Sequence, residues 1–149
     1  MEAVRKFLAG RGVGYYLSLL AAACGIAAGV LYGCTGVTSF NPDYNMGVFI
    51  CVWGAVALCA VTVVFDCKEV RYVAAMLFLY GFMWYIYSQV TYIANVFVAI
   101  DGYGFTAAFL ATFLLTFLAF VLALLGGILT NLRPRKEAGA AAEVKDETV

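Results

Sequence analysis

Four long stretches without a charged residue dominate this sequence: residues 12–42, 44–65, 72–100 and 102–132. Each is longer than the roughly 20 residues that an α-helix needs to cross a hydrocarbon core about 30 Å thick. Their apolar character is continuous, whereas a strand of a membrane barrel alternates with polar positions over about ten residues. The chain is therefore predicted to be all-α. We expect an antiparallel bundle of four transmembrane helices with short loops, at residues 14–33, 46–65, 72–93 and 105–129.

The composition agrees with a chain surrounded by membrane lipids. Hydrophobic residues make up 65% of the sequence and charged residues 12%, whereas a soluble domain has about 25% charged residues. Such a chain lacks the polar surface that would face water on all sides. Nucleic acid is excluded as a partner, because nine Lys and Arg are balanced by nine Asp and Glu and no basic stripe is present.

The basic residues predict the orientation in the membrane. Those near a helix end fall on one side of the predicted bundle: Arg5, Lys6, Arg11, Lys68, Arg71, Arg133, Arg135 and Lys136. Since Lys and Arg are enriched in cytoplasmic loops, both termini are predicted to be cytoplasmic, in a plasma membrane of the bacterial inner type. We divide the chain into a basic N-terminus (1–13), the transmembrane domain (14–132) and a charged, alanine-rich tail (133–149) that is predicted to be disordered.

Small residues recur every four positions in the first predicted helix. They are Ala21, Gly25, Gly29 and Gly33, which lie on one helix face. In lipid, such faces allow two helix backbones to approach closely and to gain van der Waals contact. The ridge therefore predicts a packing interface, either with another helix of the same chain or with a second protein.

The third predicted helix is the most polar of the four. Five side chains follow one helix face, and Gln89 lies on the neighbouring face; the five are Tyr80, Trp84, Ser88, Thr91 and Asn95. The Trp84 indole N–H and the Gln89 amide need hydrogen-bond partners at membrane depth. Two interpretations follow: a buried hydrogen-bonded seam within the bundle, or a polar cavity or interface that lines a pore or meets a partner helix.

The sequence lacks the residue types on which most membrane enzymes and proton or cation transporters depend. His is absent, and no charged residue is expected inside a membrane span to relay protons or cations. Five cysteines lie at least seven residues apart, so no C-x-x-C redox pair or zinc site is expected. No nucleophile and base can be paired, although two carboxylates could in principle act on a glycosidic bond. We therefore predict no enzyme activity, no cofactor and no metal.

The two predicted outer loops share acids, turn residues and aromatic residues. Asp43 and Tyr44 lie in the first, and Asp101 and Tyr103 in the second. Their Asn-Pro-Asp and Asp-Gly sequences are strong turn signals. The loops are interpreted either as turns that cap the helices or as a small patch that docks an external protein domain.

Three functions remain open at this stage. The first is an accessory or anchoring subunit that assembles with a larger membrane or surface-exposed protein, for example a membrane-bound enzyme such as a glycosidase, or a transporter. The second is a homo-oligomeric channel or transporter for an uncharged solute, lined by Ser88, Gln89, Thr91 and Asn95. A membrane enzyme ranks last.

Overall fold

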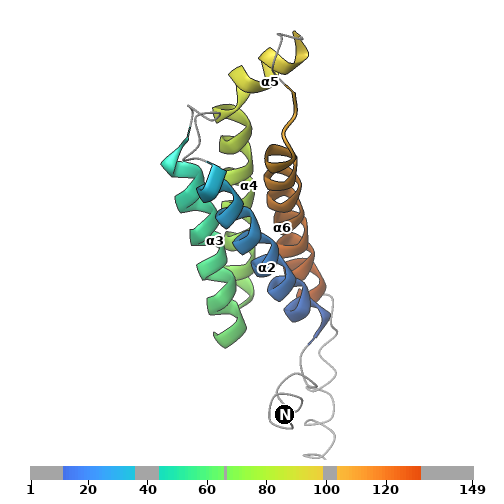
Figure 1. The fold of residues 1–149 in the computed structure, drawn as a ribbon. Helices are drawn as coiled ribbons and strands as arrows, with labels where there is room; N and C mark the ends of the chain where they lie inside the picture. The colour runs from blue at the N-terminus through green and yellow to red at the C-terminus, as the bar shows by residue number, and fades with distance from the viewer. Residues whose placement is uncertain (1–11, 36–43, 66, 99–103, 132–149) are drawn as a thin grey trace, which may run out of the picture.

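A computed structural model describes residues 12–35, 44–65, 67–98 and 104–131, and five helices account for the regular structure of these residues (Figure 1). They are α2 (Val13–Thr35), α3 (Met46–Phe65), α4 (Lys68–Ser88), α5 (Val90–Phe97) and α6 (Ala107–Asn131). The all-α prediction is thereby confirmed for the described part of the chain, in which no strand occurs. Helix is the expected outcome for apolar runs, because it satisfies backbone hydrogen bonds within each segment.

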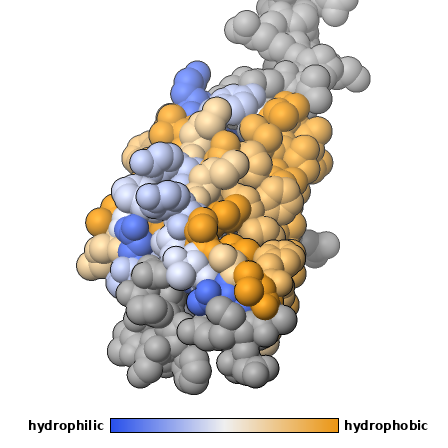
Figure 2. All heavy atoms as spheres, turned by 90° about the horizontal axis from the view of Figure 1, so that it is seen from above, coloured by the Kyte–Doolittle hydropathy of each residue, from blue (hydrophilic) through white to orange (hydrophobic). Residues whose placement is uncertain are grey.

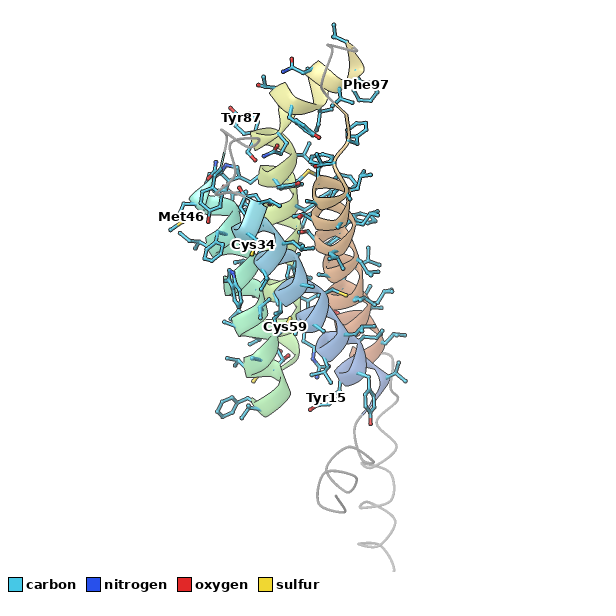
Figure 3. The ribbon with its side chains drawn as sticks, in the orientation of Figure 1. Tyr15, Cys34, Met46, Cys59, Tyr87 and Phe97 are labelled. Atoms are coloured by element: carbon cyan, nitrogen blue, oxygen red, sulfur yellow. The ribbon has the colours of Figure 1, made fainter. Side chains whose placement is uncertain are left out.

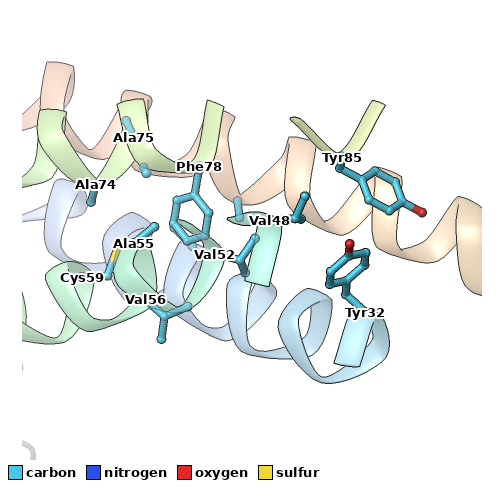
Figure 4. Packing of buried hydrophobic residues seen from close by; sticks show 13 residues of the cluster. Tyr32, Val48, Val52, Ala55, Val56, Cys59, Ala74, Ala75, Phe78 and Tyr85 are labelled. Atoms are coloured by element: carbon cyan, nitrogen blue, oxygen red, sulfur yellow. The ribbon is translucent and has the colours of Figure 1, made fainter. Parts of the chain in front are cut away.

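The four long helices pack side by side. Helix α2 contacts α3 and α6, and α4 contacts the same two helices. Each long helix contributes a fully buried alanine to the core, namely Ala21, Ala55, Ala74 and Ala119. These small side chains let the backbones approach closely, and larger residues such as Phe78 fill the remaining space (Figure 4).

Three of these helices are long and apolar enough to cross a membrane: α2 over Val13–Thr35, α4 over Glu69–Ser88 and α6 over Ala107–Leu129. Helix α3 has a shorter apolar stretch, Met46–Thr62. Many large apolar side chains of the four helices point outward, and Figure 2 shows hydrophobic residues covering much of one side when the molecule is seen from above. A surface of this kind indicates a membrane location.

The third predicted span differs from the structure, because the helix is interrupted. The sequence predicted one helix over residues 72–93, whereas α4 ends at Ser88 and α5 begins at Val90. The Ser88 hydroxyl donates to the Tyr85 carbonyl at 2.9 Å, and the Gln89 N–H is shared between the carbonyls of Tyr85 and Ile86. Side-chain competition for a helix carbonyl bends helices, and neither Gly nor Pro marks this position in the sequence.

The sequence predicted no charged residue inside a span, whereas the candidate span of α4, Glu69–Ser88, includes Glu69 and Arg71. This helix begins at Lys68 instead of Tyr72, so that Glu69 and Arg71 belong to it. The Arg71 side chain is only 2% exposed. At this exposure the guanidinium is buried together with its stem, so Arg71 does not reach out to water as long basic side chains near helix ends often do.

Candidate functional site

The predicted small-residue ridge of α2 faces other helices of the same chain. A Cβ added to Gly25 would lie 2.7 Å from ring atom Cζ of Phe78 and from Cγ2 of Val56. A Cβ on Gly29 would lie 3.0 Å from Nε1 of Trp53, and one on Gly33 would lie 3.4 Å from the Phe49 ring. Ala21, the fourth member, is fully buried. The ridge is therefore occupied by α3 and α4, as the internal-packing interpretation expects.

Among the described residues, the buried atoms without a hydrogen-bond partner include Nε1 of Trp53 and Oγ1 of Thr112. The Trp53 indole lies against Gly29, where no acceptor is offered. Other buried hydroxyls bond within their own helices: Ser18 donates to Gly14, Thr62 to Cys59 and Thr116 to Thr112. Each of these hydroxyls has given its proton to its own helix and can only accept a further hydrogen bond.

The polar residues predicted on one face are divided by the break at Gln89. Tyr80, Trp84 and Ser88 lie on α4, whereas Thr91 and Asn95 lie on α5. Gln89 is only 4% exposed, while Tyr80 and Thr91 are exposed and Asn95 is half-buried. Tyr80 and Trp84 meet edge to face with ring centroids 5.3 Å apart. The predicted residues therefore do not lie along one continuous helix, and their exposure differs from one to the next.

At the end of the bundle next to α5, a tyrosine of α2 holds the start of α3. The Tyr32 hydroxyl accepts a hydrogen bond from the Asn45 N–H at 2.9 Å and donates to the Asn45 carbonyl at 3.2 Å. The Tyr32 ring stacks on Tyr44 at 5.2 Å and meets Tyr85 edge to face at 5.6 Å. The Asn45 side chain in turn accepts from the Gly47 N–H at 2.9 Å, which caps α3.

A second tyrosine holds the start of α6 in the same manner. The Tyr92 hydroxyl donates to the Gly104 carbonyl and accepts from the Thr106 N–H at 3.1 Å. The Phe109 ring lies 5.3 Å from the Tyr92 ring and 5.7 Å from the Tyr85 ring.

The sequence did not predict the connections made by Tyr32 and Tyr92, since these tyrosines meet partners 12 to 14 residues away. Their only signal was a tyrosine near the end of a predicted helix.

Helix α5 projects from the packed helices (Figure 1). None of its residues is buried, and Phe97 at its end is 77% exposed, with Val90 and Val98 also exposed. Figure 3 places Phe97 near the tip of this projection. Among the described residues, the Phe97 ring meets the Phe105 ring edge to face, with centroids 6.1 Å apart. Helix α5 therefore offers an apolar surface that the chain itself leaves largely uncovered.

The predicted docking residues of the outer loops are described only in part. Tyr44 is exposed and stacks on Tyr32, whereas Asp43, Asp101 and Tyr103 lie outside the described residues. The five cysteines are free thiols: Cys24, Cys34, Cys51, Cys59 and Cys67.

No protein-family model matches the chain, and neither a curated protein nor a solved structure matches it. Function must therefore be argued from the surfaces of the molecule. The most distinctive of these are the projecting helix α5 and the outward face of α4.

Proposed function

We propose that this chain is a small integral membrane subunit that anchors a larger membrane or surface-exposed protein. In this proposal α2, α3, α4 and α6 form an antiparallel transmembrane bundle. Helix α3 serves as the fourth span, because its 20 residues cover about 30 Å at 1.5 Å per residue. Its sequence stays apolar as far as Phe65.

In the proposed orientation, α5 lies outside the cell and both termini lie in the cytoplasm of a plasma membrane. Helix α4 begins with Lys68 at the end of the bundle where α2 begins and α6 ends (Figure 1). The basic residues that precede α2 and follow α6 in sequence would join that end. An excess of Lys and Arg on one side favours the cytoplasm there.

The observation that carries the proposed role is the uncovered apolar surface of α5. The 21 residues of α4 cover about 31 Å and already match the hydrocarbon thickness. Helix α5 therefore stands in or beyond the headgroup layer, where exposed Val90, Phe97 and Val98 gain by contact with another protein. Aromatic residues in such positions are common anchors of protein interfaces.

The alternative, a homo-oligomeric channel for an uncharged solute, has less support. Its lining would need Ser88, Gln89, Thr91 and Asn95 on one surface. The Ser88 hydroxyl is bonded to Tyr85, Gln89 is buried, and Thr91 is exposed on a different helix. The crosslinking and flux measurements described next separate this transport role from the anchoring role.

The test is site-specific photo-crosslinking in native membranes. A photoreactive residue at Phe97 is compared with one at Leu114, an exposed residue of α6. We expect Phe97 to yield one adduct with a larger protein and Leu114 to yield lipid adducts only. Phe97→Ser should lower co-purification of that protein about tenfold, which corresponds to the loss of about 1.4 kcal/mol from one buried aromatic anchor. The control Leu114→Ala should leave co-purification unchanged.

Lipid adducts alone at Phe97 would contradict the anchoring role. A pure homo-oligomer whose solute flux in liposomes is lost in Gln89→Leu would replace that role with transport.

A further inference from the structure

The outward face of α4 carries a narrow row of exposed side chains. Val73, Met76, Tyr80, Met83 and Tyr87 are 51–76% exposed and are spaced alternately three and four residues apart. Helices α3 and α6 cover α4 on its other sides. A 3–4 spacing is the pattern by which one helix packs along another with a small left-handed crossing angle.

In the proposed transmembrane bundle, this face holds one hydroxyl, that of Tyr80, at a depth where lipid offers no partner. Tyr80 lies twelve residues after Lys68 and eight before Ser88, that is about 18 Å and about 12 Å along the helix. Helical side chains lean toward the N-terminus, so the Tyr80 hydroxyl points toward the middle of the span. Among the described residues, Tyr80 has an edge contact with Trp84 and no hydrogen bond for its hydroxyl. Polar groups inside a membrane almost always find a partner.

The missing partner must bring a hydrogen-bonding group to the same depth. We propose that the α4 face of Val73, Met76, Tyr80, Met83 and Tyr87 binds the same face of a second copy of this chain. In a parallel two-fold pair each residue meets its own equivalent at equal depth. A tyrosine hydroxyl both donates and accepts, so the two Tyr80 hydroxyls satisfy each other.

The composition of the row fits this occupant. Met76 and Met83 are flexible and polarizable, which lets them fit against an identical, equally bulky surface. Helix α5 is not needed for this contact, because the row lies within α4. The dimer rests on the proposed transmembrane placement of α4 but not on the anchoring role of α5, so the anchoring role and the dimer can fail separately.

Two measurements on the full chain in lipid vesicles test the dimer. The first is oxidative crosslinking of Met83→Cys against Leu114→Cys, with the exposed Cys34 and Cys67 changed to Ser in both. We expect an α4 dimer band at least about tenfold stronger than the α6 band, since only the former pair is held in contact. Equal bands, or a Met83→Cys adduct with a different protein, would overturn the proposal.

The second measurement is the dimer dissociation constant, obtained by energy transfer on dilution with lipid. Tyr80→Phe removes only the hydroxyl and should weaken the dimer about threefold to tenfold, the size of one interhelical hydrogen bond in lipid. Tyr87→Phe is the matched control on the same row, because Tyr87 lies next to the helix end at Ser88, where water can serve its hydroxyl. Equal effects of the two substitutions, or a wild-type chain that stays monomeric, would also overturn the proposal.

Discussion

The outward faces of α4 and α6 differ in chemistry although both helices are long and apolar. The α6 face is almost entirely aliphatic, with Leu110, Leu114, Leu118 and Leu125 exposed. The α4 face presents methionines and tyrosines instead, including a hydroxyl at mid-depth. Exposure alone therefore does not distinguish a lipid-facing surface from a protein-facing one. In the proposed dimer, exposed polar groups at mid-depth are what distinguish them, because lipid tails cannot bond such groups.

The largest effect, a loss of stability, is expected for a substitution in the core that α4 and α6 share. Gly25→Ala places a Cβ 2.7 Å from Phe78 and Val56 and forces α2 away from the core, which should cost about 1–3 kcal/mol of the free energy of unfolding. Titration of the purified protein with a denaturing detergent measures this loss. The control is Gly104→Ala, whose Cβ would meet nothing within 4 Å and should change stability by less than about 0.5 kcal/mol. Equal stabilities would mean that α2 does not pack as described.

A smaller effect is expected when α6 is given a polar group like that of α4. Leu114→Gln places an amide on the aliphatic face. The free energy of self-association through α6 should then become about 1 kcal/mol more favourable. Energy transfer between labelled chains in vesicles measures the change, with Leu114→Met as the control that keeps the face apolar. If Leu114→Gln leaves association unchanged, an unbonded polar group is not what makes a face bind protein.

The smallest effect is expected in the lipid contact of the two tryptophans. Both are half-buried, but Trp84 lies beside Tyr80 at the edge of the α4 face and packs on Gly47 of α3, whereas Trp53 lies between α2 and α3. Brominated lipids quench tryptophan fluorescence on contact, so Trp53→Phe leaves Trp84 as the reporter and Trp84→Phe leaves Trp53. We expect Trp84 to be quenched less than Trp53 when the chain is dimeric, and equally on dilution to monomer. Stronger quenching of Trp84 at all dilutions would assign the α4 face to lipid.

The sequence predicted the position of the helices better than their faces. Residues 46–65 were predicted to the residue, because Asp43 and Asp66 bound that apolar stretch. The inner faces could not be predicted, since a helix that is apolar all round has no amphipathic pattern to read. The small-residue ridge of α2 was the exception, because Gly25 and Gly29 mark close approach directly.

The candidate site was less accessible to sequence reasoning. The break at Gln89 depends on the Ser88 hydroxyl bonding the Tyr85 carbonyl, and most serines within helices do not interrupt them. The connections of Tyr32 to Asn45 and of Tyr92 to Thr106 form only when separate segments have packed together. Arg71 was placed at the membrane surface by its charge, whereas its burial depends on where α4 begins.

The interruption at Gln89 bears on how the protein meets bilayers of different thickness. A rigid helix that is too long for its bilayer must tilt or deform the lipid around it. Here the straight rod stops at Ser88 and the chain turns before α5. A change in bilayer thickness would therefore act at the joint before it tilts the packed helices, and Tyr92 would pass any movement of α5 to the start of α6 through its bonds to Gly104 and Thr106.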